Sequence, residues 1–291
     1  MNNIGSSSHR SEKRIPLISV ITVCLNAQEF IEQCIQSVLS QDFDDFEYVI
    51  IDGGSTDGTV DIIRRYQDKL VYWCSEPDQG IYHAWNKALS HAHGKWIYFL
   101  GADDYLWSPD VLEKISHHLR RGYPPYRIVY GQVALVNQRN EVLYYVGEPW
   151  CRVEKKFMQI MALPHQGVMH HVSLFDEYGV FDECFRIAGD YEFLLRELRD
   201  HDALFVPDVI MAGMQVGGIS SDPSGSLNLL REIRQAHQKL LGGESGWYWR
   251  VAYLKVWIRK LLWGILGETM TRRLLDLARI CVGKPRHWTR I

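Results

Sequence analysis

The first hundred residues alternate between continuous apolar runs and segments of helical spacing. The apolar runs are rich in β-branched and aromatic residues, as is typical of strands buried on both faces; they cover 18–25, 48–51, 70–74 and 96–100. Between them, apolar residues recur at helical spacing, which predicts helices over 29–40, 60–66 and 80–93. Strands that alternate with helices of this length form parallel βαβ units. The predicted fold class is therefore α/β with a doubly wound sheet.

The pattern changes near Pro124. Just before it, Ser108 and Pro109 predict an N-cap and a first helical turn, opening a helix that runs to about Arg120. Just after it, two runs with strand character predict an antiparallel pair over 128–137 and 142–146, which would make the sheet mixed. Further helices are predicted over 190–200 and 224–241.

The last segment, from Trp247 onward, interleaves tryptophans with basic residues. Residues 244–291 hold ten Lys and Arg but only three Asp and Glu, in a chain whose formal net charge is −3. A basic, Trp-rich, amphipathic segment of this kind is typical of a helix that lies at a membrane surface. The alternative is a helix that packs on the rest of the protein and turns a solvated basic face outward.

The composition allows one large folded domain. Of the 291 residues, 46% are hydrophobic and 23% are charged, and the small net charge creates no field that would attract nucleic acid. The first residues are polar and Ser-rich, so a disordered tail is predicted over 1–14. The main domain is predicted over 15–243 and the basic helical extension over 244–291.

The cysteines and the hydropathy exclude two other classes of protein. Six cysteines are scattered without a CxxC pair, which favours reduced, structural thiols in a cytosolic protein over a disulfide framework or a zinc site. They are Cys24, Cys34, Cys74, Cys151, Cys184 and Cys281. Because no run of about 18 apolar residues occurs, no membrane-spanning helix is predicted.

Two adjacent carboxylates, Asp103 and Asp104, follow the apolar run 96–100. Charges at the end of a buried strand must be paired or must hold a cation. In an open α/β sheet the carboxyl ends of the strands are where ligands bind. The pair therefore indicates a metal-assisted phosphate or nucleotide site, although solvated or helix-capping acids are a common alternative.

Other polar, glycine-containing loops follow the neighbouring strands. The segments 52–55 and 75–80 each close an apolar run, and Gly189-Asp190 opens a helix far downstream. Glycine lets the backbone approach a ligand, and a helix N-terminus can face a phosphate group. Together these loops predict one cleft, whereas each alone would pass for an ordinary βα turn.

Five motifs follow one another along the chain: VxTxxxN over 20–26, SVLSQ over 37–41, FEYVIIDGGSTDGT over 46–59, EPDQGIY over 76–82 and GADD over 101–104. In this order, and over roughly residues 17–220, they resemble family-2 glycosyltransferases with the GT-A fold, of the kind that act in bacterial surface polysaccharide biosynthesis. The resemblance implies a Rossmann-like mixed sheet flanked by helices. It also implies an inverting transferase that takes a nucleotide-diphosphate sugar, in the first place a UDP-sugar, with Mn²⁺ or Mg²⁺.

The resemblance assigns the donor and the metal to particular residues. Asp104 would coordinate the cation that bridges the diphosphate, and Asp103 would stand beside it, as a further ligand or facing the ribose or sugar. The assignment agrees with chemistry, since both cations prefer carboxylate and phosphate oxygens. The other donor-binding candidates are Thr22, Asn26, Asp52, Gly53, Asp78 and Asn86.

The chain departs from the family pattern at two positions near these candidates. By the resemblance, Asp52 would contact the nucleobase. Many members have a second aspartate directly after it, where this chain has Gly53. Leu25 replaces an aromatic residue that often precedes the asparagine at position 26, Asn26. Asp78 would line the nucleotide pocket, or alternatively act as a helix N-cap.

The catalytic base is sought in the segment 186–192, which resembles the later acidic motif of the family. Inversion needs a base that takes the proton of the acceptor hydroxyl. Where many members have Glu-Asp, this chain has Gly189-Asp190, so Asp190 is the candidate, and Glu192 would point elsewhere on the helix.

Pro164-His165-Gln166 resembles a family segment on the acceptor side, where His165 and Gln166 would contact the diphosphate or the acceptor. A structural histidine is the alternative for His165. His170-His171 lacks an obvious third ligand and is interpreted as structural. The segment 217–220 is either a mobile lid near the donor or a plain turn.

Two other functions fit part of the pattern. A nucleotidyltransferase or related sugar-nucleotide enzyme would usually carry a glycine-rich, basic phosphate loop after the first strand, but residues 26–29 read NAQE. A catalytically inactive sugar-nucleotide-binding module would be expected to lose Asp104 or Asp190, and both are present. The favoured hypothesis is a transferase that acts on a glycan or lipid-linked glycan, in the cytoplasm and peripherally on the inner face of the cell membrane.

Overall fold

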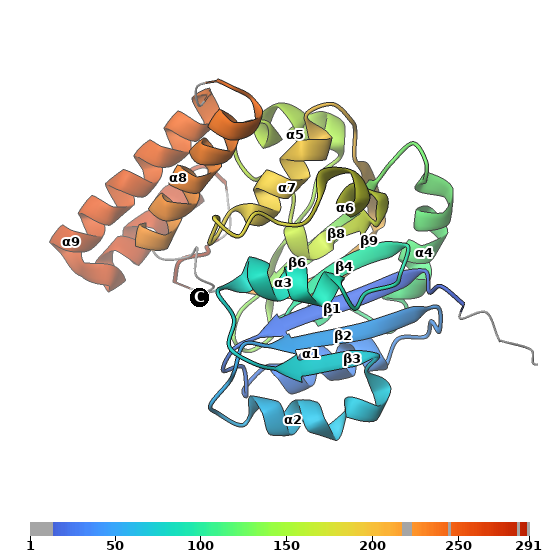
Figure 1. Cartoon of the computed structure of the whole chain (residues 1–291). Helices are drawn as coiled ribbons and strands as arrows, with labels where there is room; N and C mark the ends of the chain where they lie inside the picture. Colours follow the sequence, from blue (N-terminus) through green and yellow to red (C-terminus); the bar gives the residue numbers. More distant parts are fainter. Residues whose placement is uncertain (1–13, 217–222, 244–245, 284–285, 290–291) are drawn as a thin grey trace, which may run out of the picture.

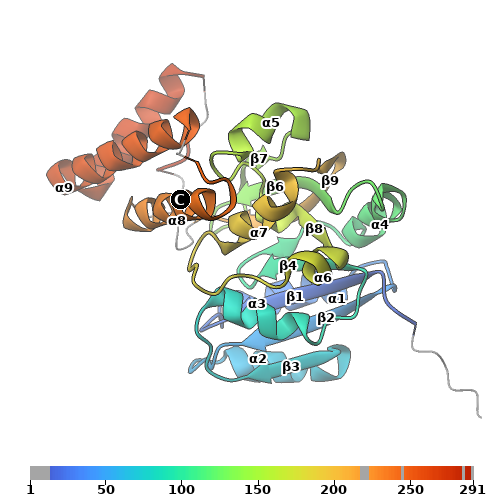
Figure 2. The same cartoon turned by 45° about the horizontal axis from the view of Figure 1, so that its top comes forward.

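One mixed sheet runs through the part of the chain that the computed structural model describes, which is residues 14–216, 223–243, 246–283 and 286–289. Within these residues nine strands are joined in the order β3-β2-β1-β4-β8-β6-β9-β5, and β7 pairs with β6 at the side. Helices lie on both faces of the sheet, and two further helices, α8 and α9, project from one end (Figures 1 and 2).

The first half of the sheet is parallel and brings its carboxyl ends to one edge. Its strands are β1 (Ile18–Cys24), β2 (Phe46–Asp52), β3 (Tyr72–Ser75) and β4 (Trp96–Gly101). Cys24 pairs with Asp52, Asp52 with Ser75, and Val23 with Gly101. The loops that follow these strands therefore emerge side by side, as the predicted cleft requires.

The second half of the sheet is mixed. It contains β5 (Tyr105–Leu106), β6 (Ile128–Val136), β7 (Val142–Val146), β8 (Val168–His171) and β9 (Leu204–Gln215). The predicted antiparallel pair is confirmed as β6 and β7. Three strands were not predicted: β5 and β8 are very short, and β9 carries Pro207-Asp208 in its interior, a pair typical of turns.

Successive side chains along the parallel strands point to opposite faces of the sheet and form two apolar layers. On one face Val20, Ile50 and Tyr98 pack against α1 (Ile31–Leu39), α2 (Thr59–Arg65) and α4 (Val111–Gly122). On the other face Ile21, Ile51 and Phe99 pack against α3 (Ile81–Leu89), α5 (Trp150–Phe157) and α7 (Gly189–Leu198). This two-sided burial explains why the strands read as continuous apolar runs rather than as alternating ones.

The helices differ from the predicted ones in two places. Helix α4 begins at Val111, and Ser108 donates its hydroxyl to Oδ1 of Asp110 instead of capping the helix, so the predicted start was wrong by a few residues. Helices α5 and α6 (Ser173–Tyr178) were not predicted, because each has only two turns or so and little periodicity to detect. Two short 3₁₀ turns cover Gln67–Lys69 and His165–Gly167.

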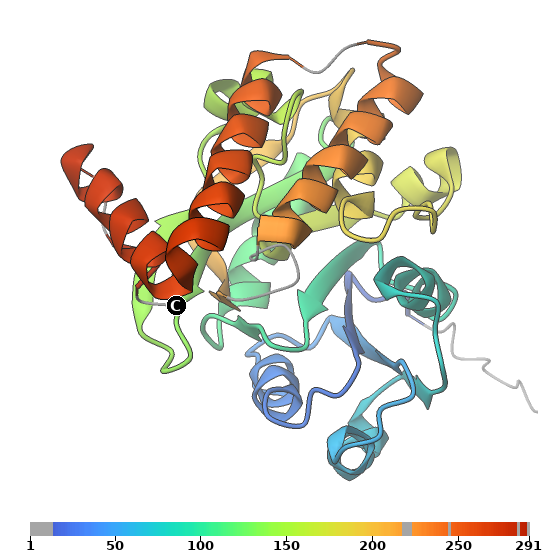
Figure 3. The same cartoon turned by 90° about the vertical axis from the view of Figure 1, so that its left-hand side faces the viewer.

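The C-terminal part consists of α8 (Pro223–Leu240) and α9 (Trp247–Cys281). Gly267 has φ 73° and ψ 171°, so α9 is two helical arms that meet at an angle, as Figure 3 shows. The first arm packs on α8: Trp249 is buried, and its indole N–H donates to the carbonyl of Leu230 at 2.7 Å.

Helix α9 exposes many large apolar side chains. The large exposed side chains there are Trp247, Leu254, Trp257, Ile258, Leu261, Ile265, Leu266, Met270, Leu274, Leu277 and Ile280. The extension thus packs on the domain, as one interpretation held, and Arg250, Lys255, Lys260 and Arg273 are exposed on it together with the apolar side chains. Among the described residues, none of the helices has the length and apolarity to cross a bilayer. The domain boundaries at 14/15 and 243/244 stay predictions, and residues 1–13 lie outside the described part.

Candidate active site

A cleft of about 760 Å³ opens at the carboxyl edge of the sheet. Its walls come from the end of β4, the start of α3, the loop 161–166, the start of α7 and the end of β9. The predicted residues Asp103, Asp104, His165, Gln166 and Asp190 all line it. The structure therefore brings together side chains from separate parts of the sequence.

The two adjacent carboxylates share one small space above Gly101, the last residue of β4. A Cβ atom added to Gly101 would lie 2.5 Å from Oδ2 of Asp104 and 3.0 Å from Oδ1 of Asp103. Glycine is required here because any side chain would fill the space that both carboxylates face. A cation could occupy it instead.

Asp104 is the buried member of the pair, with 3% of its surface exposed, and Asp103 is the exposed one. Burial raises the pKa of Asp104 well above the usual range of an aspartate, and Asp103 raises it further. Hydrogen bonds from the side chain of Gln166 and from the backbone N–H of Gln215, at 3.1 Å, act in the opposite direction. The pKa of Asp103 is also raised, by partial desolvation.

This chemistry fits a divalent cation. Two carboxylates that destabilise each other's charge are stabilised by a cation placed between them. In the described ranges no cluster of three or more His, Cys, Asp or Glu side chains could hold a metal by itself. Asp103 and Asp104 would therefore supply part of the coordination, and phosphate oxygens and water the rest, which is how Mg²⁺ is usually bound next to phosphates.

Asp190 is placed by the first turn of α7. Its Oδ1 accepts hydrogen bonds from the backbone N–H of Tyr191 at 2.8 Å and from the hydroxyl of Tyr82 at 3.3 Å. A Cβ on Gly189 would lie 2.8 Å from the ring of Tyr82, so only glycine allows α7 to approach α3 this closely. The carboxylate is thus held in a defined position on the cleft wall.

A residue that the sequence did not indicate holds the backbone before Asp190. Glu232 of α8 accepts hydrogen bonds from the backbone N–H groups of Arg186, Ile187 and Ala188, at 3.1, 2.8 and 2.8 Å. These donors would otherwise be unsatisfied just ahead of the helix. Glu232 lies more than 40 positions away along the chain, so no local pattern could have identified it.

Replacing Glu232 by glutamine is expected to lower kcat for sugar transfer by about tenfold while the KM for the donor changes little. The reason is that three charge-assisted bonds weaken, each worth about 1.5–3 kcal/mol when intact, and the loop before Asp190 loosens. Steady-state kinetics with varied donor measures the effect. Glu113→Gln, an exposed carboxylate on α4, is the matched control. A rise in KM with an unchanged kcat would refute a positioning role for Glu232.

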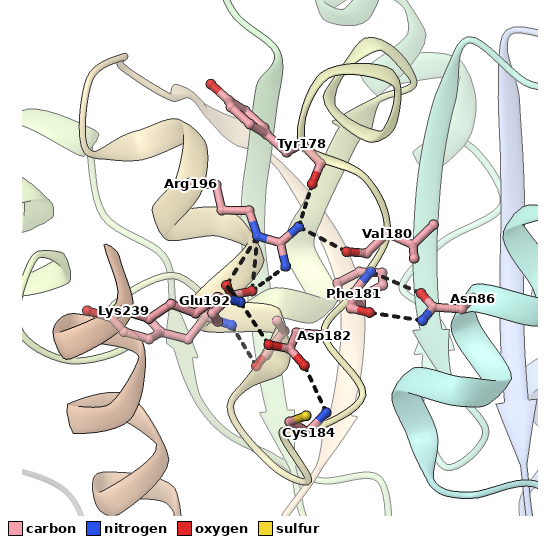
Figure 4. A network of polar contacts seen from close by, with 11 residues as sticks. Asn86, Tyr178, Val180, Phe181, Asp182, Cys184, Glu192, Arg196 and Lys239 are labelled. Carbon is pink, nitrogen blue, oxygen red and sulfur yellow. Dashed lines mark hydrogen bonds and ion pairs between the residues drawn. The ribbon is translucent and has the colours of Figure 1, made fainter. Parts of the chain in front are cut away.

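Behind Asp190, a network of ion pairs fixes α7 to α8, as Figure 4 shows. Glu192 is fully buried and binds Arg196 at 2.6 Å and Lys239 at 2.8 Å. Lys239 also binds Asp182 at 2.8 Å. The prediction that Glu192 points away from the catalytic position is confirmed, because its carboxylate is engaged in this network.

Three predicted donor-binding residues have other roles. Thr22 is fully buried and receives a hydrogen bond from Tyr48, so it cannot reach a ligand. Asn86 uses both ends of its amide on the backbone of Phe181, which fastens α3 to the loop before α7 (Figure 4). Asp52 is also fully buried. Full burial of Thr22 and Asp52 contradicts the prediction that they contact the donor directly, whereas contact of the partly exposed Asn86 stays a prediction.

Asp52 instead organises the loops of the nucleotide side. Its Oδ2 accepts hydrogen bonds from the backbone of Gly54 and Ser55 and from the hydroxyl of Ser75, at 3.1, 2.9 and 2.6 Å. These bonds lower its pKa although burial opposes them. Two adjacent strand ends are thereby tied together, which is a structural role for a carboxylate that the family resemblance placed on the base.

The remaining nucleotide-side candidates form one corner. Oδ1 of Asp78 accepts from the backbone N–H of Gly80 at 2.8 Å, and a Cβ on Gly53 would lie 2.4 Å from its Oδ2. Gly53 thus leaves room for the Asp78 carboxylate. Oδ1 of Asn26 accepts from the backbone of Thr56 at 2.9 Å, which braces the same loop. Contact of Gly53, Asp78 or Asn26 with a donor stays a prediction.

The histidines divide into two groups. His165 stacks on Trp85 at 5.1 Å in the cleft wall, burial lowers its pKa, and its Nε2 has no hydrogen-bond partner in the described residues. It is therefore a neutral imidazole next to the ligand space. His170 is fully buried, and His171 stacks on Tyr123 at 3.7 Å with its pKa lowered to about 4, mainly by burial. Both positions fit the structural interpretation of this pair.

The cleft also contains basic groups that the sequence analysis did not single out. Lys156, Arg186, Arg259 and His287 line it, the last two from the C-terminal extension. For Arg259 and His287 the only sequence signal was the basic bias of residues 244–291. The predicted lid at 217–220 lies outside the described residues. All six cysteines are free, with Cys24 and Cys34 buried.

A family model described as "Glycosyl transferase family 2" matches residues 19–174, more than half of the chain. The chain belongs to glycosyl transferase family 2. Among curated relatives, a PGL/p-HBAD biosynthesis glycosyltransferase of Mycobacterium bovis is 30% identical over 184 residues, which cover 62% of this chain and 69% of the relative. An uncharacterized glycosyltransferase of Mycobacterium tuberculosis is 29% identical over 232 residues, which cover 77% of this chain and 85% of the relative.

Solved structures support the same fold. The 1–349 fragment of TarS from S. aureus, in complex with UDP-GlcNAc, superposes with a TM-score of 0.60 at 20% identity, covering 77% of this chain and 67% of the fragment. The match covers 40% of a longer TarS chain. The mannosyltransferase PcManGT from Pyrobaculum calidifontis, in complex with GDP-Man and Mn²⁺, gives a TM-score of 0.61 at 18% identity and covers 92% and 81% of the two chains. The fold is thus GT-A, and the protein is a glycosyltransferase.

Proposed function

We propose that this family-2 glycosyltransferase transfers a sugar from a nucleotide-diphosphate sugar to a hydroxyl of a glycan or lipid-linked glycan, with a divalent cation and with inversion at the anomeric carbon. The observation that carries the proposal is the placement of Asp103, Asp104 and Asp190 in one cleft. Structural neighbours in complex with UDP-GlcNAc and with GDP-Man and Mn²⁺ support a donor and a cation of this kind.

The residues divide the reaction between two sides of the cleft. Asp104 and Asp103 would hold the cation, which supplies charge stabilisation for the departing diphosphate. Asp190 would take the proton of the acceptor hydroxyl as that oxygen bonds to the anomeric carbon and the nucleoside diphosphate leaves. His165 is neutral, and its Nε2 has no partner among the described residues, so it is suited to a hydrogen bond with the donor or the acceptor.

A UDP-sugar is proposed as the first donor to test, with a GDP-sugar as the next. A cognate donor stabilises the folded protein by mass action, by about 2.7 kcal/mol at a hundred times its Kd. A thermal-shift screen of UDP- and GDP-sugars with and without Mn²⁺ is expected to give a rise in Tm that needs both components. The same screen in EDTA is the control. A panel in which neither nucleotide class shifts Tm with Mn²⁺ would contradict the proposed donor and metal dependence.

We further propose that the enzyme works peripherally at the cytoplasmic face of the cell membrane, in surface polysaccharide biosynthesis. The exposed apolar side chains of α9, among them Trp257, Leu261 and Ile265, together with the basic bias of residues 244–291, support this. Cosedimentation with vesicles of anionic phospholipid measures the association, and a chain that stays in the supernatant would refute it.

A further inference from the structure

A second cavity, of about 510 Å³, is lined by residues from both arms of α9. Val256 of the first arm and Leu275, Ala278 and Val282 on the side of the second arm form its apolar wall, and Trp288 closes one side. Its volume is within the range of pockets that enclose a small organic ligand. Nothing in the proposed transfer reaction uses this cavity.

This cavity adjoins the catalytic cleft, since Arg259 and Trp288 line both. Arg259 is largely buried, its guanidinium lies 4.8 Å from the centre of the Trp288 ring, and it donates to the hydroxyl of Ser226 at 2.6 Å. A positive group is therefore fixed where the apolar cavity meets the polar cleft.

The wall that contains Trp288 is held by a buried carboxylate. Asp276 of the second arm accepts hydrogen bonds from the backbone N–H groups of His287, Trp288 and Thr289, at 2.8, 2.9 and 2.8 Å. These bonds lower its pKa to about 2, although burial opposes the shift. His287 is thereby placed in the cleft beside Tyr144, at 3.3 Å from the Tyr144 hydroxyl.

On its other side the cavity opens to the exposed apolar surface of α9. Ile258 and Val282 line the cavity and are themselves 42% and 69% exposed. A hydrocarbon chain could thus enter the cavity from a lipid surface along these apolar side chains, while Lys255 and Arg279 are the other basic members of the lining. The sequence of environments, from apolar surface to apolar cavity to fixed cation to polar cleft, matches a molecule with a hydrocarbon chain, an anionic link and a sugar.

We propose that the cavity between the arms of α9 binds the hydrocarbon chain of the acceptor, and that this acceptor is a lipid joined through phosphate to a sugar. This inference rests on the proposed function and names its acceptor class. The phosphate would lie near Arg259, and the hydroxyl end would extend into the cleft toward Asp190. The cavity makes the C-terminal extension part of the substrate-binding machinery rather than only a membrane contact.

Calorimetric titration of the full chain, below the micelle concentration of each probe, tests the proposal. Farnesyl phosphate, with fifteen carbons, is expected to bind at least about tenfold more tightly than dimethylallyl phosphate, with five, because each buried methylene contributes about 0.8 kcal/mol. Farnesyl phosphate is also expected to bind more tightly than farnesol, because only the phosphate interacts with the cation at the junction.

Two matched substitutions on the second arm separate the cavity from the surface. Ala278→Trp fills the cavity and is expected to weaken farnesyl phosphate binding by at least about tenfold. Leu277→Trp, at an exposed neighbour outside the cavity, is expected to leave the affinity within about twofold. Both variants are expected to keep the donor-induced thermal shift with Mn²⁺, which also shows that they fold.

Three outcomes would overturn the proposal. The first is equal affinity for farnesyl and dimethylallyl phosphate. The second is equally tight binding of dihexanoyl-phosphatidylglycerol, which would indicate a site for ordinary phospholipid. The third is a second copy of the chain in the cavity, seen in sedimentation velocity as a dimer that Ala278→Trp dissociates. Because donor binding is measured separately, failure of the lipid titration with an intact donor shift would leave the proposed function standing.

Discussion

Replacing Asp104 by asparagine is expected to reduce sugar transfer by about 10²-fold to 10³-fold or more and to remove the effect of Mn²⁺ on donor binding. The substitution keeps the size of the side chain and an oxygen that can accept the hydrogen bond from Gln215. It removes the buried negative charge that would neutralise the cation and, through it, the charge on the leaving diphosphate. Initial rates with saturating donor, and donor affinity with and without Mn²⁺, measure the two effects.

The same variant is expected to be more stable than the original chain when metal is absent. The pKa of Asp104 is raised in the folded protein, so the folded state binds a proton that the unfolded state has released, and stability falls as pH rises above the ordinary aspartate range. The asparagine side chain does not titrate and carries no such penalty. In EDTA, the Tm of the variant should therefore exceed that of the original chain by more at about pH 8 than at about pH 5.

The control for this variant is Asp68→Asn, at an exposed carboxylate in the 3₁₀ turn Gln67–Lys69. It should change neither the rate nor the pH dependence of Tm. A variant at position 104 that retains a Mn²⁺-dependent increase in donor affinity would contradict the metal role. A variant that loses transfer activity and whose Tm is lower than that of the original chain at both pH values would point to misfolding instead.

Much of the catalytic half could be predicted from the sequence, because its determinants are local. Buried parallel strands read as continuous apolar runs, and the topology then places the loops after β1, β2, β3 and β4 at one edge of the sheet. That inference and the family resemblance were enough to predict that three acidic residues share one cleft. They are the pair Asp103 and Asp104 and the single acid of the later motif, Asp190. The structure places all three on its walls.

What the sequence could not reveal are contacts between distant segments. Thr22 and Asp52 lie within motifs that the family resemblance assigns to the donor, and only their burial and hydrogen bonds show that they hold the scaffold. Asn86 likewise fastens α3 to the loop before α7 through hydrogen bonds that no local pattern predicts. Glu232 supports the loop before Asp190 from another helix. Composition marked residues 244–291 as basic and Trp-rich, but it gave no sign that Gly267 divides α9 or that Trp288 returns to the cleft.

Replacing Asp190 by asparagine is expected to lower kcat by about 10²-fold to 10⁴-fold, the usual contribution of a general base, while the donor-induced thermal shift is retained. Asparagine preserves the volume and can still accept the hydrogen bonds from Tyr191 and Tyr82, so the cleft should keep its shape. The variant loses only the ability to take the acceptor proton.

Tyr82→Phe is the matched comparison for Asp190, since it removes one hydrogen bond to the carboxylate and leaves the base in place. We expect it to cost far less than Asp190→Asn, about tenfold or less, because this single bond is long, at 3.3 Å, and contributes less than the roughly 1.5–3 kcal/mol of a short bond to a carboxylate. Near-normal turnover of Asp190→Asn would transfer the role of the base to another group on the cleft wall. The other candidates on that wall are Asp103, which is exposed, and His165, which burial keeps neutral and able to accept a proton. Double variants that combine Asp190→Asn with a substitution of Asp103 or of His165 would decide which of the two acts.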